Sequence, residues 1–457
     1  MDAKSLLLQE KEILVDEILK LRAENAELRK ELEDLKKRIP SPFEKSEDHP
    51  KKRSKPPSQW GRKAGHVGCT RPKPDHIDRE VEQTLKRCRD CQGHLSGSVG
   101  VVEHIQEDIV PSRVEVTRFK RHRYWCRQCE KLVEAPDGPE EVPCGYLGPL
   151  VLAQMVMLKY YHGLPGNKIK KLFEVFCGLK VSEGAIAQAL QRISKWLQVE
   201  TQTILEAIRK SVYVHVDETG WKINGTGHWL WAFVNQKLAF YKIDRSRGSK
   251  VPKELLGNPF PGILISDFYS AYNKMDCRQQ KCLVHLLREM RDCRGKDPPE
   301  DYRVPYKKLK RILSDAHRLQ AQHGRMSPLA FVRRVRRLKE RLFLFATTPH
   351  SNKHWQRLSG RFLKHEKNML TFLDFPGLPS NNNHAERMIR PHVILRNRWF
   401  HNRTDKGSSA HGSLTSILHS LLLQNKPPIP SLMQSYLRHR QGSPQPILFS
   451  HLNTSIR

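Results

Sequence analysis

A seven-residue repeat of leucines runs through the N-terminal segment. Five leucines recur at heptad spacing, at Leu7, Leu14, Leu21, Leu28 and Leu35. This spacing is typical of the d positions of a coiled coil, and a polar residue at an a position, here Asn25, favours two strands in fixed register. We therefore predict a leucine-zipper coiled coil over residues 1–39 that makes a homodimer. An amphipathic helix packed on its own domain is the alternative.

Helical periodicity dominates residues 147–199, and the stretch LPGNKIKKLFEVFCGLKVSEGAIAQALQRISKWL has the rhythm of a helix-turn-helix. Ser182 is expected to cap the second helix. The polar side of that helix carries the residues that we expect to contact DNA, Gln188, Gln191, Arg192 and Lys195. We assign a helical, helix-turn-helix-like region to residues 141–205, with an ordinary packed helix pair as the alternative.

Alternating apolar positions then predict strands in SVYVHVDE, HWLWAFVN and LAFYKID. The turns between them are expected at Asn224, Gly225, Gly227, Asn235 and Gln236. A fourth apolar run, ILISD, follows the turn signal GNPFPG, so two predicted strands end in an aspartate, Asp217 and Asp267. Neighbouring strands that end in this way can hold a divalent cation between two carboxylates, because hard cations prefer oxygen ligands.

The residues around Asp217 have other expected roles. Glu218 should point to the opposite face of the strand and shape the turn, so we do not assign it to a metal. Three tryptophans are expected in the core or as stacking groups, Trp221, Trp229 and Trp231.

A third acid stands in NNNHAERMIRP, where Asn383 can cap a helix that carries Glu386 in its first turn. Pro391 is expected to limit or kink that helix. Four arginines in and after this segment are candidates for contacting phosphates, Arg387, Arg390, Arg396 and Arg398. Glu386 can equally serve as a capping residue, and each of the three acids taken singly fits a structural role.

Charge narrows the choice of partner. The 457 residues carry 80 lysines and arginines against 48 acidic residues, a formal net charge of +32, which points to nucleic acid. No apolar run approaches a membrane span and the first residues do not resemble a signal peptide, so we expect a soluble intracellular protein. Residues 40–80 read as a basic flexible linker in which Arg62 and Lys63 can follow a phosphate backbone; a solubilising tract is the alternative.

Two Cys-x-x-Cys pairs, Cys88 with Cys91 and Cys126 with Cys129, lie within residues 81–140. Four thiolates close a tetrahedral structural zinc site, so we predict a small zinc-ribbon-like module. A disulfide or buried free thiols are the alternatives.

The sequence blocks HVDETGWKINGTGHWLWAF, LISDFYSAYNK, KCLVHLLREM and LPSNNNHAERMIRPHVILRNRWF resemble the successive blocks of the insertion-sequence 66 family of bacterial transposases. The resemblance covers nearly the whole chain. It implies a DDE transposase with a ribonuclease H-like catalytic core. The triad would be Asp217, Asp267 and Glu386, which would bind two Mg²⁺ or Mn²⁺ ions. Cys282 and His285 match a C-x-x-H feature of the family, for which we expect packing roles because two ligands are too few for zinc.

The expected fold class is multidomain α+β/α/β. The resemblance divides the catalytic region into a first core part at 206–295, a helical insertion at 296–375, a last core part at 376–412 and a C-terminal tail at 413–457. The function it implies is binding of terminal inverted repeats, cleavage of DNA phosphodiesters and strand transfer by two-metal chemistry. Expected partners are double-stranded DNA at transposon ends and target, a second copy of the chain or a higher oligomer, and accessory transposition proteins.

The expected location is the bacterial cytoplasm, in association with the nucleoid. The alternatives are a non-catalytic DNA-binding regulator derived from a transposase, and a nuclease that cuts without strand transfer.

Overall fold

The computed structural model describes residues 76–83, 87, 89–90, 92–94, 101, 104–106, 113–138, 141–142, 145–294, 298–399, 401–440, 446 and 448–449. The zipper residues 1–39 and four of the predicted site residues, Arg62, Lys63, Cys88 and Cys91, lie outside this part. Contacts divide the chain into two units, residues 1–108 and 109–457, and each is described by itself. In the first unit, Arg87 and His94 form an isolated antiparallel bridge.

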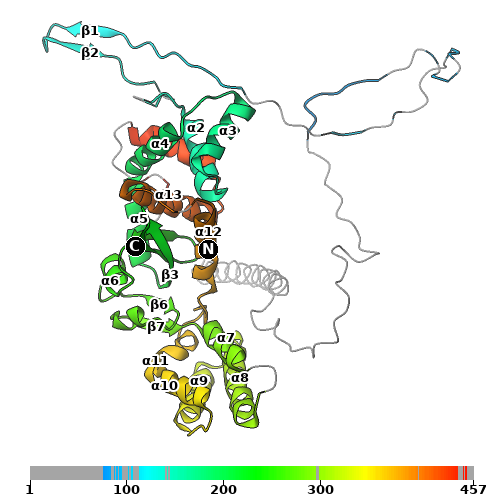
Figure 1. Cartoon of the computed structure of the whole chain (residues 1–457), viewed down its shortest axis with the longest axis vertical. Helices are drawn as coiled ribbons and strands as arrows, with labels where there is room; N and C mark the ends of the chain where they lie inside the picture. Colours follow the sequence, from blue (N-terminus) through cyan, green and yellow to red (C-terminus); the bar gives the residue numbers. More distant parts are fainter. Residues whose placement is uncertain are drawn as a thin grey trace, which may run out of the picture. The chain divides into compact units, whose positions relative to one another are not determined.

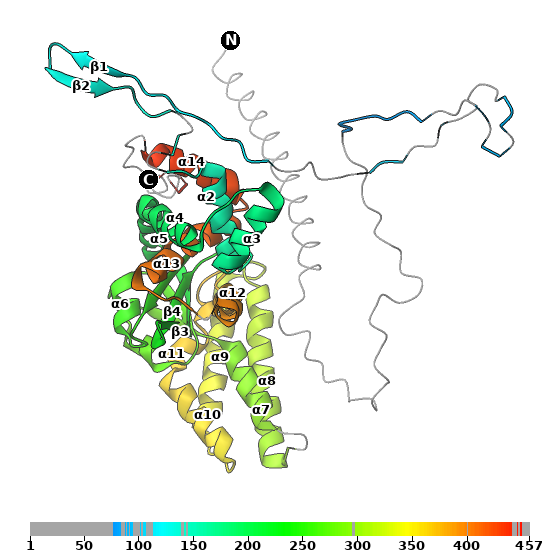
Figure 2. The same cartoon turned by 45° about the horizontal axis from the view of Figure 1, so that its top comes forward.

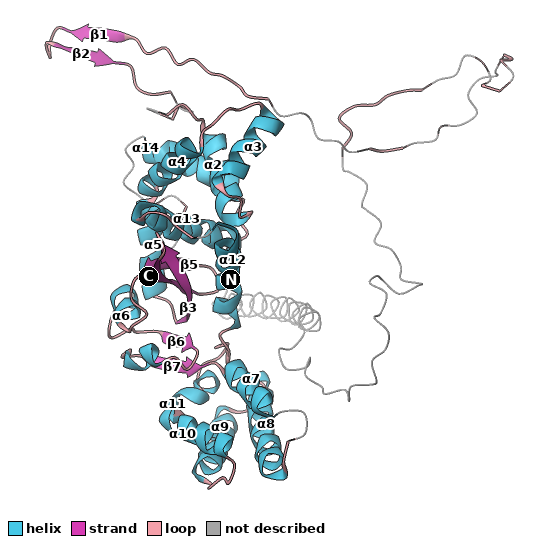
Figure 3. Ribbon diagram, in the orientation of Figure 1, coloured by secondary structure: helices cyan, strands magenta, loops and turns pink. Residues whose placement is uncertain are grey.

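A mixed sheet lies at the centre of the second unit (Figure 3). Its strands are β3 (Tyr213–Ile223), β4 (Thr226–Val234), β5 (Ala239–Asp244), β6 (Ile263–Ser266) and β7 (Arg278–Lys281). Their order is β5-β4-β3-β6-β7: β3, β4 and β5 form an antiparallel meander, whereas β6 runs parallel to β3 and β7 parallel to β6. The expected turn at Asn224 and Gly225 joins β3 to β4 with φ of 47° and 78°, a conformation that asparagine and glycine tolerate best.

Helices cover both faces of this sheet (Figure 1). On one face, α5 (Gln198–Arg209) and α6 (Lys250–Leu256) share a hydrophobic cluster with Val214 and Val216 of β3. On the other face, α12 (Asn383–Trp399) packs Ala385 and Ile389 against β4. A short 3-10 helix, η3 (Ser270–Lys274), joins β6 to β7.

The edge strand β5 is covered by α13 (Asp405–Leu423). The backbone N–H groups of Ala239 and Tyr241 donate to the hydroxyls of Ser420 and Ser416, at 3.0 and 2.8 Å. The helix thus satisfies donors that an edge strand would leave open to another chain. The boundary expected at residue 412 falls inside this buried helix, so residues 405–423 belong to the core.

A helical layer precedes the sheet. It contains α2 (Pro149–Val156), the π-helical turn η2 (Met157–Tyr161), α3 (Gly166–Cys177) and α4 (Glu183–Trp196). Ser182 caps α4, as predicted: its hydroxyl accepts from the backbone N–H of Ala185 at 3.1 Å. Besides α2 and α3, α4 packs against α13 and α14 (Pro428–Arg440), so it is held on several sides.

Between β7 and α12 the chain forms a helical subdomain (Figure 2). Its elements are α7 (Leu283–Arg294), α8 (Glu300–Ala321), α9 (Pro328–Thr347), α10 (Lys353–Lys364), α11 (Glu366–Met369) and η4 (Thr371–Leu373). The core of these helices includes Trp355 and Phe345 and continues onto Ile263 and Ile265 of β6. The helices expected within residues 296–375 are therefore present.

A two-stranded hairpin, β1 (Arg123–Cys126) and β2 (Lys131–Glu134), holds the second Cys-x-x-Cys pair. No helix in the described ranges is both long enough and apolar enough to cross a membrane.

Candidate active site

The register of two parallel strands sets Asp217 and Asp267 at the same level of the sheet. His215 of β3 pairs with Ile265 of β6, and each aspartate lies two residues further along its own chain segment. Asp267 directly follows β6, as predicted. Asp217, by contrast, lies inside β3, which continues to Ile223, so the expected strand end at this position is wrong. The long strand is stable because β4 pairs with β3 beyond the point where β6 stops.

Glu386 reaches the same region from the first turn of α12. Its backbone N–H donates to the carbonyl of Asn382 at 3.2 Å, so Asn382, and not Asn383 as expected, directly precedes the first turn. The side-chain acceptor at this end is Asn381 Oδ1, which binds the Asn383 N–H at 3.1 Å. The side chain of Asn382 is fully buried and binds β3: its Nδ2 donates to the carbonyl of Val216 at 2.8 Å, and its Oδ1 lies 3.1 Å from His215 Nδ1. Sequence reasoning missed this positioning role, for which the NNN run was the available signal.

Pro391 was expected to limit or kink α12. The limit is wrong, since the helix runs through Pro391 to Trp399, whereas the kink stays a prediction. Buried contacts hold both halves of the helix, through Ile389 before the proline and through His392 and Leu395 after it. Tertiary packing therefore offsets the hydrogen bond that proline removes.

Burial and the neighbouring acids act on the carboxyl group of Asp217. Burial raises the pKa of Asp217 to about 7, and the nearby carboxylates of Glu218, Asp267 and Glu386 add to this effect. The backbone N–H of Glu218 donates to Asp217 Oδ1 at 2.9 Å, and this hydrogen bond offsets the increase of the pKa only in part. Glu386 Oε1 is buried without a hydrogen-bond partner among the described residues, although His285 Nε2 lies 3.6 Å away. Such a group of oxygen donors, mutually repelling and incompletely satisfied, fits hard divalent cations.

Glu218 lies on the opposite face of β3 from Asp217, as predicted, but it shapes no turn. Its carboxylate accepts a short hydrogen bond from the Tyr272 hydroxyl and another from Arg247 Nε at 3.0 Å. Arg247 stacks on the rings of Trp229 and Tyr269, each 4.2 Å from its guanidinium carbon. Glu218 therefore ties β3 to the segment that follows Asp267.

A buried lysine lies behind the second aspartate. Lys281 has no exposed surface, and its Nζ donates to the hydroxyl of Ser266 at 3.2 Å. Burial lowers the pKa of Lys281 to about 8, and the nearby charge of Asp267 opposes this decrease. The carboxylate of Asp267 itself accepts from the backbone N–H of Tyr269 at 2.9 Å. Nothing in the pattern KCLVHLL had predicted that Lys281 is buried near Asp267.

The basic residues near α12 have different environments. Arg387 and Arg390 are exposed. Arg396 donates to Thr219 Oγ1 and to the Gly220 carbonyl of β3 at 2.9 and 2.6 Å, and Arg398 donates to the His162 carbonyl at 3.2 Å. Arg396 and Arg398 therefore have structural partners of their own.

Two of the three tryptophans are core residues, as predicted: Trp221 and Trp231 are buried, whereas Trp229 carries the Arg247 stack. On α4, Gln188 and Lys195 are exposed, whereas Gln191 and Arg192 are half-buried.

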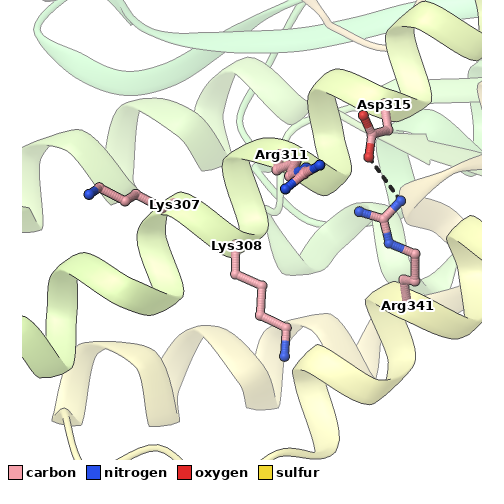
Figure 4. Close-up of a pocket in the computed structure, with 5 residues that line it drawn as sticks. All are labelled: Lys307, Lys308, Arg311, Asp315 and Arg341. Atoms are coloured by element: carbon pink, nitrogen blue, oxygen red, sulfur yellow. Dashed lines mark hydrogen bonds and ion pairs between the residues drawn. The ribbon is translucent and has the colours of Figure 1, made fainter.

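The helical subdomain has a basic pocket of about 500 Å³ between α8 and α9 (Figure 4). Four cationic side chains and one carboxylate line it, those of Lys307, Lys308, Arg311, Arg341 and Asp315. Asp315 accepts from Arg341 at 2.8 Å and from Arg318 at 2.6 Å, so its charge is compensated. The side chains that line the pocket therefore carry a net positive charge.

In the β1–β2 hairpin, Cys126 ends β1 and Cys129 lies in the turn that follows, and both occur as free thiols. The pKa of Cys126 is lowered by hydrogen bonds to its sulfur, first from the backbone N–H of Cys129, then from the Cys129 thiol and then from the backbone N–H of Gln128. Backbone donors around a sulfur favour the thiolate that zinc requires.

Comparison with known proteins places the chain in a family. The family model described as "Transposase IS66 family" matches residues 144–410. A second model, the zinc-finger binding domain of transposase IS66, matches residues 86–130.

Two similar proteins are the uncharacterized proteins y4qI and y4jD of Sinorhizobium fredii. The first is 23% identical over 433 residues, which cover 85% of this chain and 78% of that protein. The second is 24% identical over 408 residues, which cover 81% of this chain and 78% of that protein. Because the first family model spans more than half of the 457 residues, the chain belongs to the IS66 family of transposases, and it carries that family's zinc-finger domain.

Proposed function

We propose that this chain is a DDE transposase that binds the terminal inverted repeats of its element, cleaves DNA phosphodiesters and joins the freed ends to target DNA. Asp217, Asp267 and Glu386 are the catalytic residues. The observation that carries the proposal is geometric: the register of β3 and β6 sets Asp217 and Asp267 at the same level of the sheet, and α12 carries Glu386 on the same side. The carboxylates of Asp267 and Glu386 lie near enough to Asp217 to add to the increase of its pKa, to about 7, that burial causes first.

The strand order supports a ribonuclease H-like core. A three-stranded antiparallel meander is followed by two parallel strands, and a helix carrying the third acid crosses one face. In this interpretation α7 to α11 form a helical subdomain inserted between the second and third acids.

The oxygen donors fit a pair of Mg²⁺ or Mn²⁺ ions held by Asp217, Asp267 and Glu386. When bound, such ions supply Lewis acidity and charge neutralisation for phosphodiester chemistry. The protein's own contribution is position: the Asn382 side chain fixes the start of α12 on β3, and Glu218 fixes the segment after Asp267. With the ions bound, Asp217 is expected to be ionised at neutral pH, because their positive charge offsets the repulsion from the other acids.

Double-stranded DNA is the proposed partner, in accordance with the net charge of +32. Arg387 and Arg390 are exposed on the helix that carries Glu386, and the α8–α9 pocket offers further cations to phosphates. Three further parts of the chain extend this DNA interface. They are the zinc finger, whose proposed ligands are Cys88, Cys91, Cys126 and Cys129, the linker residues Arg62 and Lys63, and the exposed Gln188 and Lys195 of α4.

The experiment is cleavage of a labelled linear DNA that carries the element's terminal repeats, with Mg²⁺ or Mn²⁺. We expect Asp217→Asn to lose at least about 1,000-fold in rate while it retains binding to the ends, because the chemistry depends on the acids as a unit. The matched control is Asp276→Asn, which removes an exposed carboxylate of the same core. Equal cleavage by Asp217→Asn and wild type would exclude the triad.

Two alternative functions give different results in this assay. A regulator would bind the ends without metal-dependent cleavage by any variant. A nuclease would cleave but fail to join a pre-cut end to target DNA.

A further inference from the structure

A sulfur, a nitrogen and an oxygen converge beside the third acid. Cys282, His285 and Glu386 each offer one ligand atom, and these atoms lie within 4.8 Å of one another. Cys282 follows β7, His285 lies in the first turn of α7 and Glu386 lies in the first turn of α12. The sequence predicted only two ligands here, Cys282 and His285. Two contacts bring the start of α12 close to them: the Leu283 N–H donates to the Ser380 carbonyl at 3.0 Å, and the Asn382 N–H donates to Cys282 Sγ at 3.1 Å.

The sulfur of Cys282 is fully buried and surrounded by backbone donors. The N–H of Asn382 donates to Sγ at 3.1 Å, and the N–H groups of Val284 and His285 also point toward it. Cys282 directly precedes α7, and these N–H groups are donors to its sulfur, but burial outweighs them and raises the pKa of the thiol. A bound cation would offset the effect of burial and favour the thiolate.

The other two ligands are incompletely satisfied. His285 Nδ1 and Glu386 Oε1 are both buried without a hydrogen-bond partner in the described part of the chain, and His285 Nε2 is 3.6 Å from that oxygen. Buried polar atoms of this kind commonly indicate an ion or water that completes the site. The side chains of His285 and Glu386 remain 31% exposed, which leaves a path for an ion from solvent.

We propose that Cys282, His285 and Glu386 form a binding site for a thiophilic divalent cation, with Zn²⁺ as the probe. A mixed set of sulfur, nitrogen and oxygen ligands is typical of zinc, whereas Mg²⁺ takes oxygen ligands and does not favour thiolate. Three protein ligands leave the fourth tetrahedral position open. Arg288 opposes binding, because its Nη2 lies 3.8 Å from Glu386 Oε2 and adds positive charge.

This site has a consequence that rests on the proposed function. Glu386 cannot bind the thiophilic ion and the catalytic ions tightly at the same time, because both sites would share its one carboxylate. Zinc is therefore an inhibitor that competes for the third acid.

The test counts zinc in the full-length chain after equilibration with excess Zn²⁺ and removal of the unbound ion. We expect one equivalent at the zinc finger and one at the new site. Cys282→Ser and His285→Ala should each lose one equivalent. Cys293→Ser removes another thiol of α7 and should lose none. Arg288→Gln should bind the second equivalent more tightly than wild type, because it removes the opposing charge.

Circular dichroism establishes that the variants are folded, and His285→Ala, at a half-exposed position, tests the site if Cys282→Ser unfolds. The same zinc content in wild type, Cys282→Ser and His285→Ala would overturn the proposal. A second readout is Co²⁺ added to a variant in which the four zinc-finger cysteines Cys88, Cys91, Cys126 and Cys129 are all replaced by serine: thiolate-to-cobalt absorption should appear and should vanish when Cys282→Ser is added.

In the cleavage assay, zinc should inhibit wild type more strongly than folded Cys282→Ser. If wild type does not cleave, the proposed function fails, whereas the zinc count still decides whether the site exists.

Discussion

At the scale of single residues, the molecule concentrates unfavourable charge at one position. Asp217 is partly buried beside three other acids, and its pKa of about 7 reflects a carboxylate that is costly to ionise without a cation. Binding sites are commonly built in this way, with groups that are unstable alone and stable with their ligand. Asp217 therefore lowers the stability of the ion-free fold, as expected of the catalytic role that we propose for it.

Neutralising this carboxylate should stabilise the ion-free protein. The pKa of Asp217 is raised in the folded state, so its protonated form contributes stability that is present below about pH 4 and is lost as the pH rises through about 7. The free energy of unfolding of Asp217→Asn should therefore equal that of wild type near pH 4 and be larger by on the order of 2 kcal/mol at pH 8. Urea unfolding without Mg²⁺ measures the difference. Asp276→Asn should show no such trend, and a destabilised Asp217→Asn at pH 8 would contradict the argument.

At the scale of elements, α13 approaches the edge strand β5 closely. A Cβ atom at Gly412 would lie 2.8 Å from the backbone carbonyl oxygen of Tyr241, a distance that real Cβ atoms do not adopt. Without a side chain there, the helix can come near enough for Ser416 and Ser420 to bind the strand. A single glycine thus allows a helix to protect a sheet edge.

Replacing glycine by alanine in two helices should give opposite results. Gly412→Ala should cost about 2 to 3 kcal/mol, because the clash with a backbone atom exceeds the roughly 1 kcal/mol gained from helix propensity. Gly360→Ala in α10 has open space around the added carbon and should stabilise by about 1 kcal/mol. Thermal or urea unfolding measures both changes. Similar effects of the two substitutions would refute the proposed close contact.

At the scale of the whole molecule, helices α12 and α13 meet around buried histidines. His392 and His411 lie 3.0 Å apart through ring nitrogens, and His419 Nδ1 lies 2.8 Å from the Tyr241 hydroxyl. Burial lowers the pKa of His411 to about 3 and that of His419 to about 4, and holds that of His392 well below its usual value. The contact between these helices therefore requires neutral imidazoles.

Acid should weaken this packing. A lowered folded-state pKa means that the contribution of these histidines is complete above about pH 6.5 and is lost as the pH falls toward about 4 and 3. The contribution of the histidines to the free energy of unfolding should decrease over this range, whereas that of Asp217 increases as the pH falls. His419→Gln should flatten the decrease, whereas His354→Gln, at an exposed position, should not. Urea unfolding at pH 7, 6, 5 and 4 measures it, and parallel curves for wild type and His419→Gln would reject the explanation.

Much of the local structure could be predicted from the sequence. Alternation of apolar residues indicated the strands, Ser182 marked the start of α4, and Asn224 with Gly225 marked a hairpin, because each depends on residues close in the chain. Alternation also separated Asp217 from Glu218. The basic composition, the paired cysteines and the family's sequence blocks required no tertiary information.

Other features were decided only by long-range packing. Whether β3 ended at Asp217 depended on its pairing with β4, and whether α12 survived Pro391 depended on the buried residues on both sides of it. Asn382, and not Asn383, precedes the first turn of α12, and its side chain binds β3, a partner that is distant in the chain. The convergence of Cys282 and His285 with Glu386 joins segments that are distant in the chain. A sequence therefore determined which elements form and which chemical groups they carry. Which groups meet was decided by strand register and helix packing, since these depend on contacts that no local pattern encodes.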